Sequence, residues 1–167
     1  MMKHNACIEL ISAETGLEAD AVARALGLFV RGLVEELLLL GQVCIRGIGC
    51  FELRSVPSRH DNGQLIPPAR EVVFTSRSVQ GNDALRVFRS KAMLDMSTSR
   101  KILRLYVSCF RRSAKVGDEF RLEGLGVFRN EGVRYTFVPD RSVHDLFNTG
   151  LGILIPWRSH QGTRGKL

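Results

Sequence analysis

The stretch Gly41-Gln42-Val43-Cys44-Ile45-Arg46-Gly47-Ile48-Gly49-Cys50-Phe51-Glu52-Leu53 decides how this chain folds. A long run with apolar residues at helical spacing precedes it, and Gly41 is placed to end that helix as a C-terminal glycine. The pattern after Gly41 predicts a strand, a turn around Gly47-Ile48-Gly49 and a second strand. Because this Gly-x-Gly precedes a strand and not a helix, it is not typical of a phosphate-binding loop.

A similar stretch returns from Gly117 to Phe128. Aligning Gly47 with Gly124 gives an offset of 77 residues, the difference between their positions, and the long helices before the two stretches then coincide. A period this long, seen twice, favours duplication of a domain over a solenoid.

Helices are expected on both sides of these stretches. Residues 4–14 have a short helical pattern, and a long helix with a wide apolar face runs to Leu40, with Thr15 and Glu18 as a capping box or with a later start at Asp20. Its last turn is apolar almost all round, which predicts burial in a core or a dimer interface.

Three more helices are expected further along. One runs from an Asn82 cap to about Leu94, and one from a Ser97 or Thr98 cap to about Lys115. A short one follows over 139–147.

Residues 51–74 predict a two-stranded β-ribbon that leaves the body and returns. Asn62-Gly63 is a strong signal for a tight hairpin turn. Three prolines in the ribbon suit exposed strands without partners on both sides. The corresponding segment of the second half, from Phe128 to Phe137, has room only for a bare hairpin.

The charge of the chain is positive and unevenly distributed. Its 167 residues carry a net charge of +7, and 44% of them are hydrophobic, which is enough for a core. Residues 1–77 contain 8 Lys and Arg against 9 Asp and Glu, whereas residues 78–167 contain 16 against 8. This balance favours a polyanionic partner, and the alternative is a solvated basic face without one.

The cysteines and histidines do not have the spacing of a metal site. We expect Cys7, Cys44, Cys50 and Cys109 to be buried reduced thiols, and neither a metal nor a cofactor is predicted. Residues 1–9 lack the apolar run of a secretory signal, and the run 37–40 is too short to cross a bilayer. The expected location is cytoplasmic, without membrane association.

The succession of elements resembles the HU/IHF family of bacterial DNA-binding proteins. Gly41, the run 47–54, the ribbon and Val72-Val73-Phe74 carry the resemblance. It implies an α+β fold with a helical base, a small antiparallel β-sheet and a β-ribbon arm, here duplicated in one chain. The expected division is a unit over 1–90 with its arm at about 54–70, a reduced unit over 91–149 with a short hairpin, and a tail over 150–167.

The family pattern also implies how DNA would be held. Its dimers reach around the duplex with two arms in the minor groove, where an apolar wedge at each tip can kink the DNA. Here the arm is shorter, the Arg-Asn-Pro tip is missing and His60 falls near the position of the wedge proline. The second unit has almost no arm, and only one helix lies between Phe74 and Ser97 for two units to use.

The resulting hypothesis is architectural, nucleoid-associated binding of double-stranded DNA without sequence specificity or by shape. The ribbon would enter the minor groove, and basic helix and saddle surfaces would contact phosphates. The candidate DNA-binding residues are Arg54, Arg59, His60, Asn62, Gln64, Arg70, Arg77, Arg100, Lys101, Arg129, Arg134 and Arg141.

Two questions stay open at this level. The alternative function is an HU-like protein-interaction or scaffold module that has lost DNA binding, and no constellation of side chains indicates an enzyme. The units form either an intramolecular pseudo-dimer or, between two chains, a homodimer.

Overall fold

The computed structural model describes residues 4–149, and within them the chain is an α+β fold with small antiparallel sheets. The labelled helices are α1 (His4–Thr15), α2 (Ala19–Leu40), α3 (Asp83–Ala92) and α4 (Met96–Val116). Residues 141–149 are also helical. The expected tail over 150–167 lies outside the described residues.

In the described part of the chain, the strands form three antiparallel sheets. Two of these have three strands, in the orders β1-β2-β5 and β6-β7-β8, and the third is the β3-β4 hairpin. The strands are β1 (Gln42–Ile45), β2 (Gly49–Val56), β3 (Arg59–Asp61), β4 (Gln64–Ile66), β5 (Ala69–Thr75), β6 (Phe120–Leu122), β7 (Gly126–Glu131) and β8 (Arg134–Pro139).

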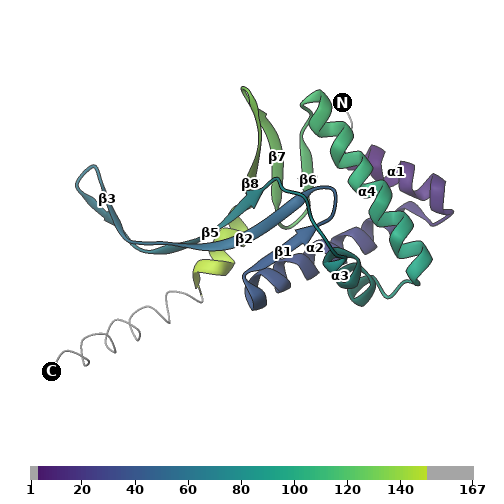
Figure 1. The fold of residues 1–167 in the computed structure, drawn as a ribbon, viewed down its shortest axis with the longest axis horizontal. Coiled ribbons are helices and arrows are strands. Elements are labelled where there is room, and N and C mark those ends of the chain that lie inside the picture. Colours follow the sequence, from purple (N-terminus) through teal and green to yellow (C-terminus); the bar gives the residue numbers. More distant parts are fainter. Residues whose placement is uncertain (1–3, 150–167) are drawn as a thin grey trace.

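Helices α1 to α4 gather on one side of the molecule and the sheets lie beside them (Figure 1). The helix over 141–149 lies at the base of the long ribbon, which extends away from the other helices (Figure 1). Helix α1 packs against both α2 and α4, and α3 packs against α2, α4 and β1. Strand β5 lies against β8, so the two three-stranded sheets meet. The result is one continuous core made by residues from both halves of the chain.

Four phenylalanine rings join the sheets. Phe51 and Phe74 face each other on β2 and β5, and Phe128 and Phe137 do so on β7 and β8. The cross-sheet pairs Phe51–Phe137 and Phe74–Phe128 have ring centroids 5.0 Å and 4.8 Å apart. Aromatic pairs at such distances stabilise a core beyond the area they bury. These cross-sheet contacts are nearly equal, as in an arrangement with approximate twofold symmetry.

Helix ends show where local sequence signals were sufficient. Gly41 and Gly117 have φ of 75° and 77° at the ends of α2 and α4, which confirms the predicted stops. The predicted capping box is wrong, because the Thr15 hydroxyl donates to the Ile11 carbonyl within α1 and α2 begins after Glu18.

The other two predicted caps have different outcomes. Asn82 lies at the predicted position before α3, but its side chain makes no capping hydrogen bond. Helix α4 is capped by the Asp95 carboxylate, which accepts from the Thr98 backbone N–H at 3.1 Å, and not by Ser97 or Thr98.

The expectation of four reduced cysteines is wrong for two of them. Cys44 and Cys50 face each other across β1 and β2 with Cα atoms 4.1 Å apart and form a disulfide. The Leu53 N–H donates to the Gly41 carbonyl, so Gly41 and Leu53 are a hydrogen-bonded pair. The two kinds of pair alternate along an antiparallel ladder, which makes Cys44 and Cys50 a non-hydrogen-bonded pair, the kind in which side chains lie closest. Cys7 and Cys109 are free and buried, as expected.

Candidate nucleic-acid interface

The protruding ribbon has two parts separated by prolines. Its base is the β2-β5 pair and its tip is the β3-β4 hairpin, with Pro57 on one strand and Pro67-Pro68 on the other between them. Proline cannot donate to a strand ladder, so the pairing stops there and resumes beyond it. Asn62 and Gly63 have φ of 50° and 77°, and both positive values fit a tight hairpin turn.

The tip presents two different faces. Arg59 lies opposite Ile66 and Asp61 lies opposite Gln64, whereas His60 lies opposite Leu65. Because successive side chains of a strand point to opposite faces, Arg59 and Gln64 share one face and His60 shares the other with Leu65. Leu65 is 64% exposed. Leu65 was not among the candidate residues predicted from the sequence, although its position two residues after Asn62-Gly63 places it at the tip.

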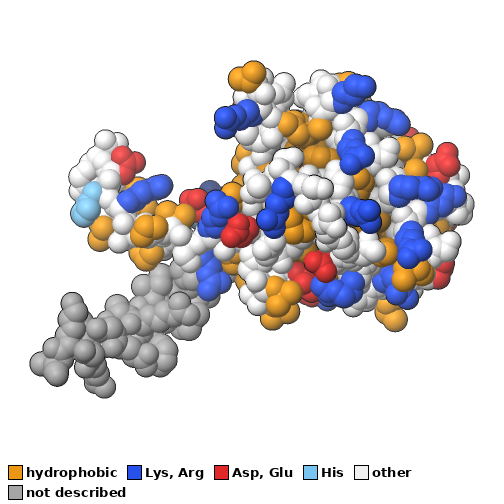
Figure 2. Space-filling model, in the orientation of Figure 1, with side chains coloured by type: hydrophobic (Ala, Val, Ile, Leu, Met, Phe, Trp, Pro, Cys, Tyr) orange, Lys and Arg blue, Asp and Glu red, His pale blue; other side chains and the backbone are white. Residues whose placement is uncertain are grey.

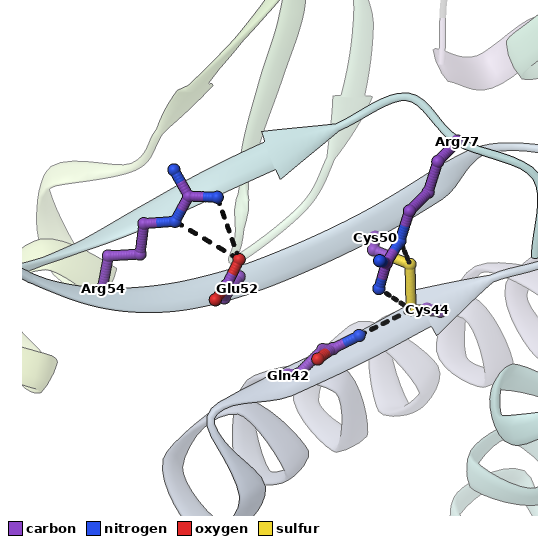
Figure 3. Close-up of polar contacts among 6 residues, drawn as sticks. All are labelled: Gln42, Cys44, Cys50, Glu52, Arg54 and Arg77. Carbon is purple, nitrogen blue, oxygen red and sulfur yellow. Dashed lines mark hydrogen bonds and ion pairs between the residues drawn. A yellow bond between two sulfur atoms is a disulfide. The ribbon is translucent and has the colours of Figure 1, made fainter.

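The charges at the base of the ribbon are balanced. The Arg54 guanidinium donates to the Glu52 carboxylate at 3.1 Å, and Glu71 lies directly opposite Arg54 (Figure 3). From Gly49 to Thr75 the ribbon carries three arginines and three acidic residues. Arg54 is therefore a compensated charge, and the ribbon as a whole has no net charge.

Arg70 and Arg141 come together at the foot of the ribbon. Both line a hollow of about 340 Å³ together with His144 and Glu71. The Asn148 side chain holds this part of the strand, because its amide oxygen accepts from the Arg70 backbone N–H at 2.8 Å and its amide nitrogen donates to the Arg70 carbonyl. This junction fixes the ribbon to the helix over 141–149.

Arg129 and Arg134 lie on the short β7-β8 hairpin. Arg134 is exposed and directly opposite Glu131, and Arg129 is partly buried opposite Thr136. The hairpin tip also exposes Val133 completely. This second hairpin reaches a much shorter distance from the body than the ribbon does (Figure 1).

Arg77, Arg100 and Lys101 lie away from the ribbon, in hollows along α4. A hollow of about 1050 Å³ is walled by α3, α4 and the β1-β2 turn, and it contains Arg100 and Lys101. This wall has three further cations that were not among the predicted candidates, Arg46, Arg104 and Arg111. The available signal for Arg104 and Arg111 was their helical spacing from Arg100, which places these three arginines on one face of α4.

Arg77 lies beside the disulfide. Its Nε is 3.1 Å from Cys50 Sγ, and Gln42 Nε2 is 3.4 Å from Cys44 Sγ (Figure 3). Arg77 also lines a hollow of about 500 Å³ with Arg46 and Arg111. The structure thus places the candidate residues in four separate groups, on the ribbon, at its foot, on the short hairpin and along α4.

No protein-family model and no curated protein matches this sequence. Within the part of the chain that the structure describes, no helix is long and apolar enough to span a membrane.

Proposed function

We propose that this protein is an HU/IHF-like architectural DNA-binding protein in which one chain contains two related units. The observation that carries the proposal is the exposed two-stranded ribbon, which projects from a helical body and ends in a polar hairpin (Figure 1). A ribbon of this kind has the width to enter a DNA groove. The proposed location is the bacterial nucleoid in the cytoplasm.

Equivalent positions in the two halves support the duplication. The Ile48 N–H donates to the Ile45 carbonyl at 3.0 Å, and 77 positions later the Leu125 N–H donates to the Leu122 carbonyl at 2.9 Å. A Cβ on Gly49 would meet the Phe74 ring, and a Cβ on Gly126 would meet the Phe137 ring. The turn hydrogen bond and the glycine–phenylalanine contact therefore occur at corresponding positions of both halves. From this we infer an intramolecular pseudo-dimer with one long arm and one short arm.

The ribbon tip would supply the contacts to DNA. Arg59, Asn62 and Gln64 offer a cation and hydrogen-bonding groups for the minor groove, while Arg70 and Arg141 at the foot would contact phosphates. Leu65 is an exposed apolar side chain at the tip, of the kind that can insert between base pairs. It would replace the missing proline as the wedge.

The first experiment measures duplex binding by mobility shift across a salt series. Wild-type protein is expected to bind at low salt and to weaken steeply as salt rises, because bound cations release counterions from the phosphates. Arg59→Ala with Arg70→Ala should weaken binding, and Arg24→Ala with Arg31→Ala is the control that removes the same charge from α2. Equal loss in both double variants would contradict a specific role for the ribbon.

A shortened ribbon gives a sharper version of this test. Val56 and Ala69 are opposite each other, so Pro57–Pro68 can be replaced by Asn-Gly as a two-residue turn. We expect this variant to keep its thermal stability, since the removed tip contributes no buried residue, and to lose most DNA bending measured by fluorescence energy transfer. Leu65→Ala should reduce the bend angle more than it reduces affinity.

A protein-interaction module is the second candidate. It is favoured by the balanced charge of the ribbon and by the exposed side chains of Leu38, Leu39 and Leu40 at the end of α2. This exposure differs from the burial expected for that helix end. A complete absence of duplex binding at low salt would favour this candidate over DNA binding.

A further inference from the structure

A continuous cationic trough runs along α4 on the helical side of the molecule. The 1050 Å³ hollow shares Arg46, Gly47 and Arg111 with the hollow that contains Arg77. At its other end it shares Asn82, Leu85, Met96 and Arg100 with a third hollow, which contains Arg86 and Arg89. The three hollows together make one open channel between α4, α3 and the β1-β2 turn, which we call the α4 trough.

The charge of the α4 trough is almost uncompensated. Among the described residues, none that lines its three hollows is acidic. Asp83 and Asp95 are the nearest acids in sequence, and the Asp95 carboxylate is engaged as the cap of α4. Arg86 is paired with Glu36 at 3.1 Å, so it is excluded from the count of available cations. The available cations are Arg46, Arg77, Arg89, Arg100, Lys101, Arg104 and Arg111.

The β1-β2 turn is held against α4 to form one wall. Arg111 Nε donates to the Gly47 carbonyl at 3.2 Å, and a Cβ on Gly47 would come within 2.6 Å of Val107. The equivalent Gly124 has no atom within 4 Å of such a Cβ. The second half of the chain therefore has no matching wall at its own turn, and the trough is a feature of one side of the molecule.

The cations are arranged in a line. Arg100, Arg104 and Arg111 share a face of α4, and at 1.5 Å rise per residue they span about 16 Å. B-DNA has one phosphate per 3.4 Å of helix axis on each strand, so this length corresponds to about five base-pair steps along the duplex axis. No aromatic ring within residues 4–149 lines the trough, which disfavours stacking of unpaired bases. A phosphate backbone fits this chemistry better than exposed bases do.

The trough and the ribbon tip lie at opposite ends of the molecule. The ribbon extends to the left in Figure 1, whereas α3 and α4 lie on the right, where Lys and Arg side chains gather in Figure 2. We propose that the α4 trough binds the phosphate backbone of a second duplex, so that the protein bridges two DNA segments. The proposal rests on the proposed function for binding of the first duplex at the ribbon. The second duplex would be bound by the trough cations, which are different residues from those of the ribbon.

The test uses two duplexes of about 20 base pairs, far below the persistence length of DNA, so that neither can wrap around the body. One duplex is attached to beads and the other is fluorescent, and capture of the second by bead-bound protein is measured at low salt. Wild-type protein is expected to capture it. Arg100→Glu with Arg104→Glu should lower capture at least about tenfold, since two phosphate contacts become repulsive.

Two further variants separate the sites. Arg24→Glu with Arg31→Glu makes the same charge change on α2 and should leave capture close to wild type. The shortened ribbon should still bind a single duplex through the trough but capture no second one. Circular dichroism checks that each variant is folded.

Two outcomes would overturn the proposal in distinguishable ways. If wild-type protein shifts a single duplex but captures no second one, or if the Arg100 and Arg104 reversals leave capture unchanged, bridging through the trough is wrong while the ribbon function stands. If wild-type protein binds neither duplex, both the trough proposal and the DNA-binding proposal fail.

Discussion

At the scale of single residues, two glycines differ in the room that the fold leaves for a side chain. Gly126 lies under Phe137, and a Cβ there would be 2.5 Å from the ring carbon Cζ. Gly27, on an exposed part of α2, has nothing within 4 Å of an added Cβ. The two positions therefore make a matched pair for one substitution.

We expect Gly126→Ala to lower the free energy of unfolding by about 1–3 kcal/mol, because the Phe137 ring must move within a packed core. Gly27→Ala should raise it by about 0.5–1 kcal/mol through its higher helix propensity. Urea denaturation measures both. A neutral Gly126→Ala would mean that the four phenylalanines are not packed as described.

Both tyrosines of the chain are held in their neutral form by the fold. Burial raises the pKa of Tyr135 to about 12, with the Asp118 and Glu119 charges adding to the effect, and its hydroxyl donates to the Asp118 carbonyl at 2.6 Å. Burial also raises the pKa of Tyr106, which is only 1% exposed. Neither ring should ionise at the ordinary tyrosine pKa of about 10 while the protein is folded.

The difference between the tyrosine pKa values of the folded and the unfolded chain predicts how stability changes at alkaline pH. A pKa raised in the folded state gives stability that is complete below about pH 10 and is lost as the pH rises towards 12. We expect the free energy of unfolding to fall over that range and tyrosinate absorbance to be absent from the folded protein near pH 10. Tyr135→Phe should flatten the fall, and a tyrosinate signal in folded wild type at pH 10 would show that the pKa of at least one of the two rings is not raised.

At the scale of elements, the sequence was most informative where a backbone signal acts alone. The ribbon, its Asn62-Gly63 turn and the glycine stops of α2 and α4 could all be predicted, because each depends on a few adjacent residues. Helix caps were less predictable. Asp95, Ser97 and Thr98 could each cap α4, and in the structure the Asp95 carboxylate accepts from the Thr98 backbone N–H.

The candidate site could be predicted from the sequence only where its residues are close together in the chain. The ribbon residues could be selected from the chain, but the α4 trough joins Arg46 and Arg111, which only tertiary packing brings together. The Cys44–Cys50 disulfide depends on the register of β1 and β2, which places the two cysteines opposite each other. The spacing rules for metal and redox motifs do not take strand register into account.

The β1-β2 hairpin carries a prediction about these thiols. Protein unfolded without reductant should react with a thiol reagent at two cysteines, Cys7 and Cys109, and at all four after reduction. Opening the short disulfide loop should cost about 2 kcal/mol of stability, because the unfolded chain regains conformational entropy. Cys44→Ser with Cys50→Ser should match the stability of the reduced protein. Four reactive thiols without reductant would show that the disulfide is absent.

At the scale of the whole molecule, the two halves share one core but expose different surfaces. The phenylalanine contacts between the sheets are nearly symmetric, whereas one half has the long ribbon and the turn that closes the α4 trough. This arrangement lets each half specialise without losing the partner that completes its core. In a homodimer of identical chains, any change to one arm would appear in both.

The contact between Phe74 and Phe128 tests whether that core forms within one chain. Their rings are 4.8 Å apart with an interplanar angle of 87°, and such edge-to-face pairs couple by about 0.5–1.5 kcal/mol. A double-mutant cycle of Phe74→Leu and Phe128→Leu should show that coupling, whereas Phe74→Leu with Phe29→Leu should be additive because Phe29 contacts Phe88 and Tyr106 instead.

The coupling and the melting temperature should also be independent of protein concentration, because the two halves are covalently joined and need no second chain. Mass measurement in solution should then give a species near 18.7 kDa. A melting temperature that rises with concentration, together with twice that mass, would show that the phenylalanine contacts form between chains. The trough would then occur twice on each particle, and the bridging assay should capture more than one fluorescent duplex per bead-bound complex.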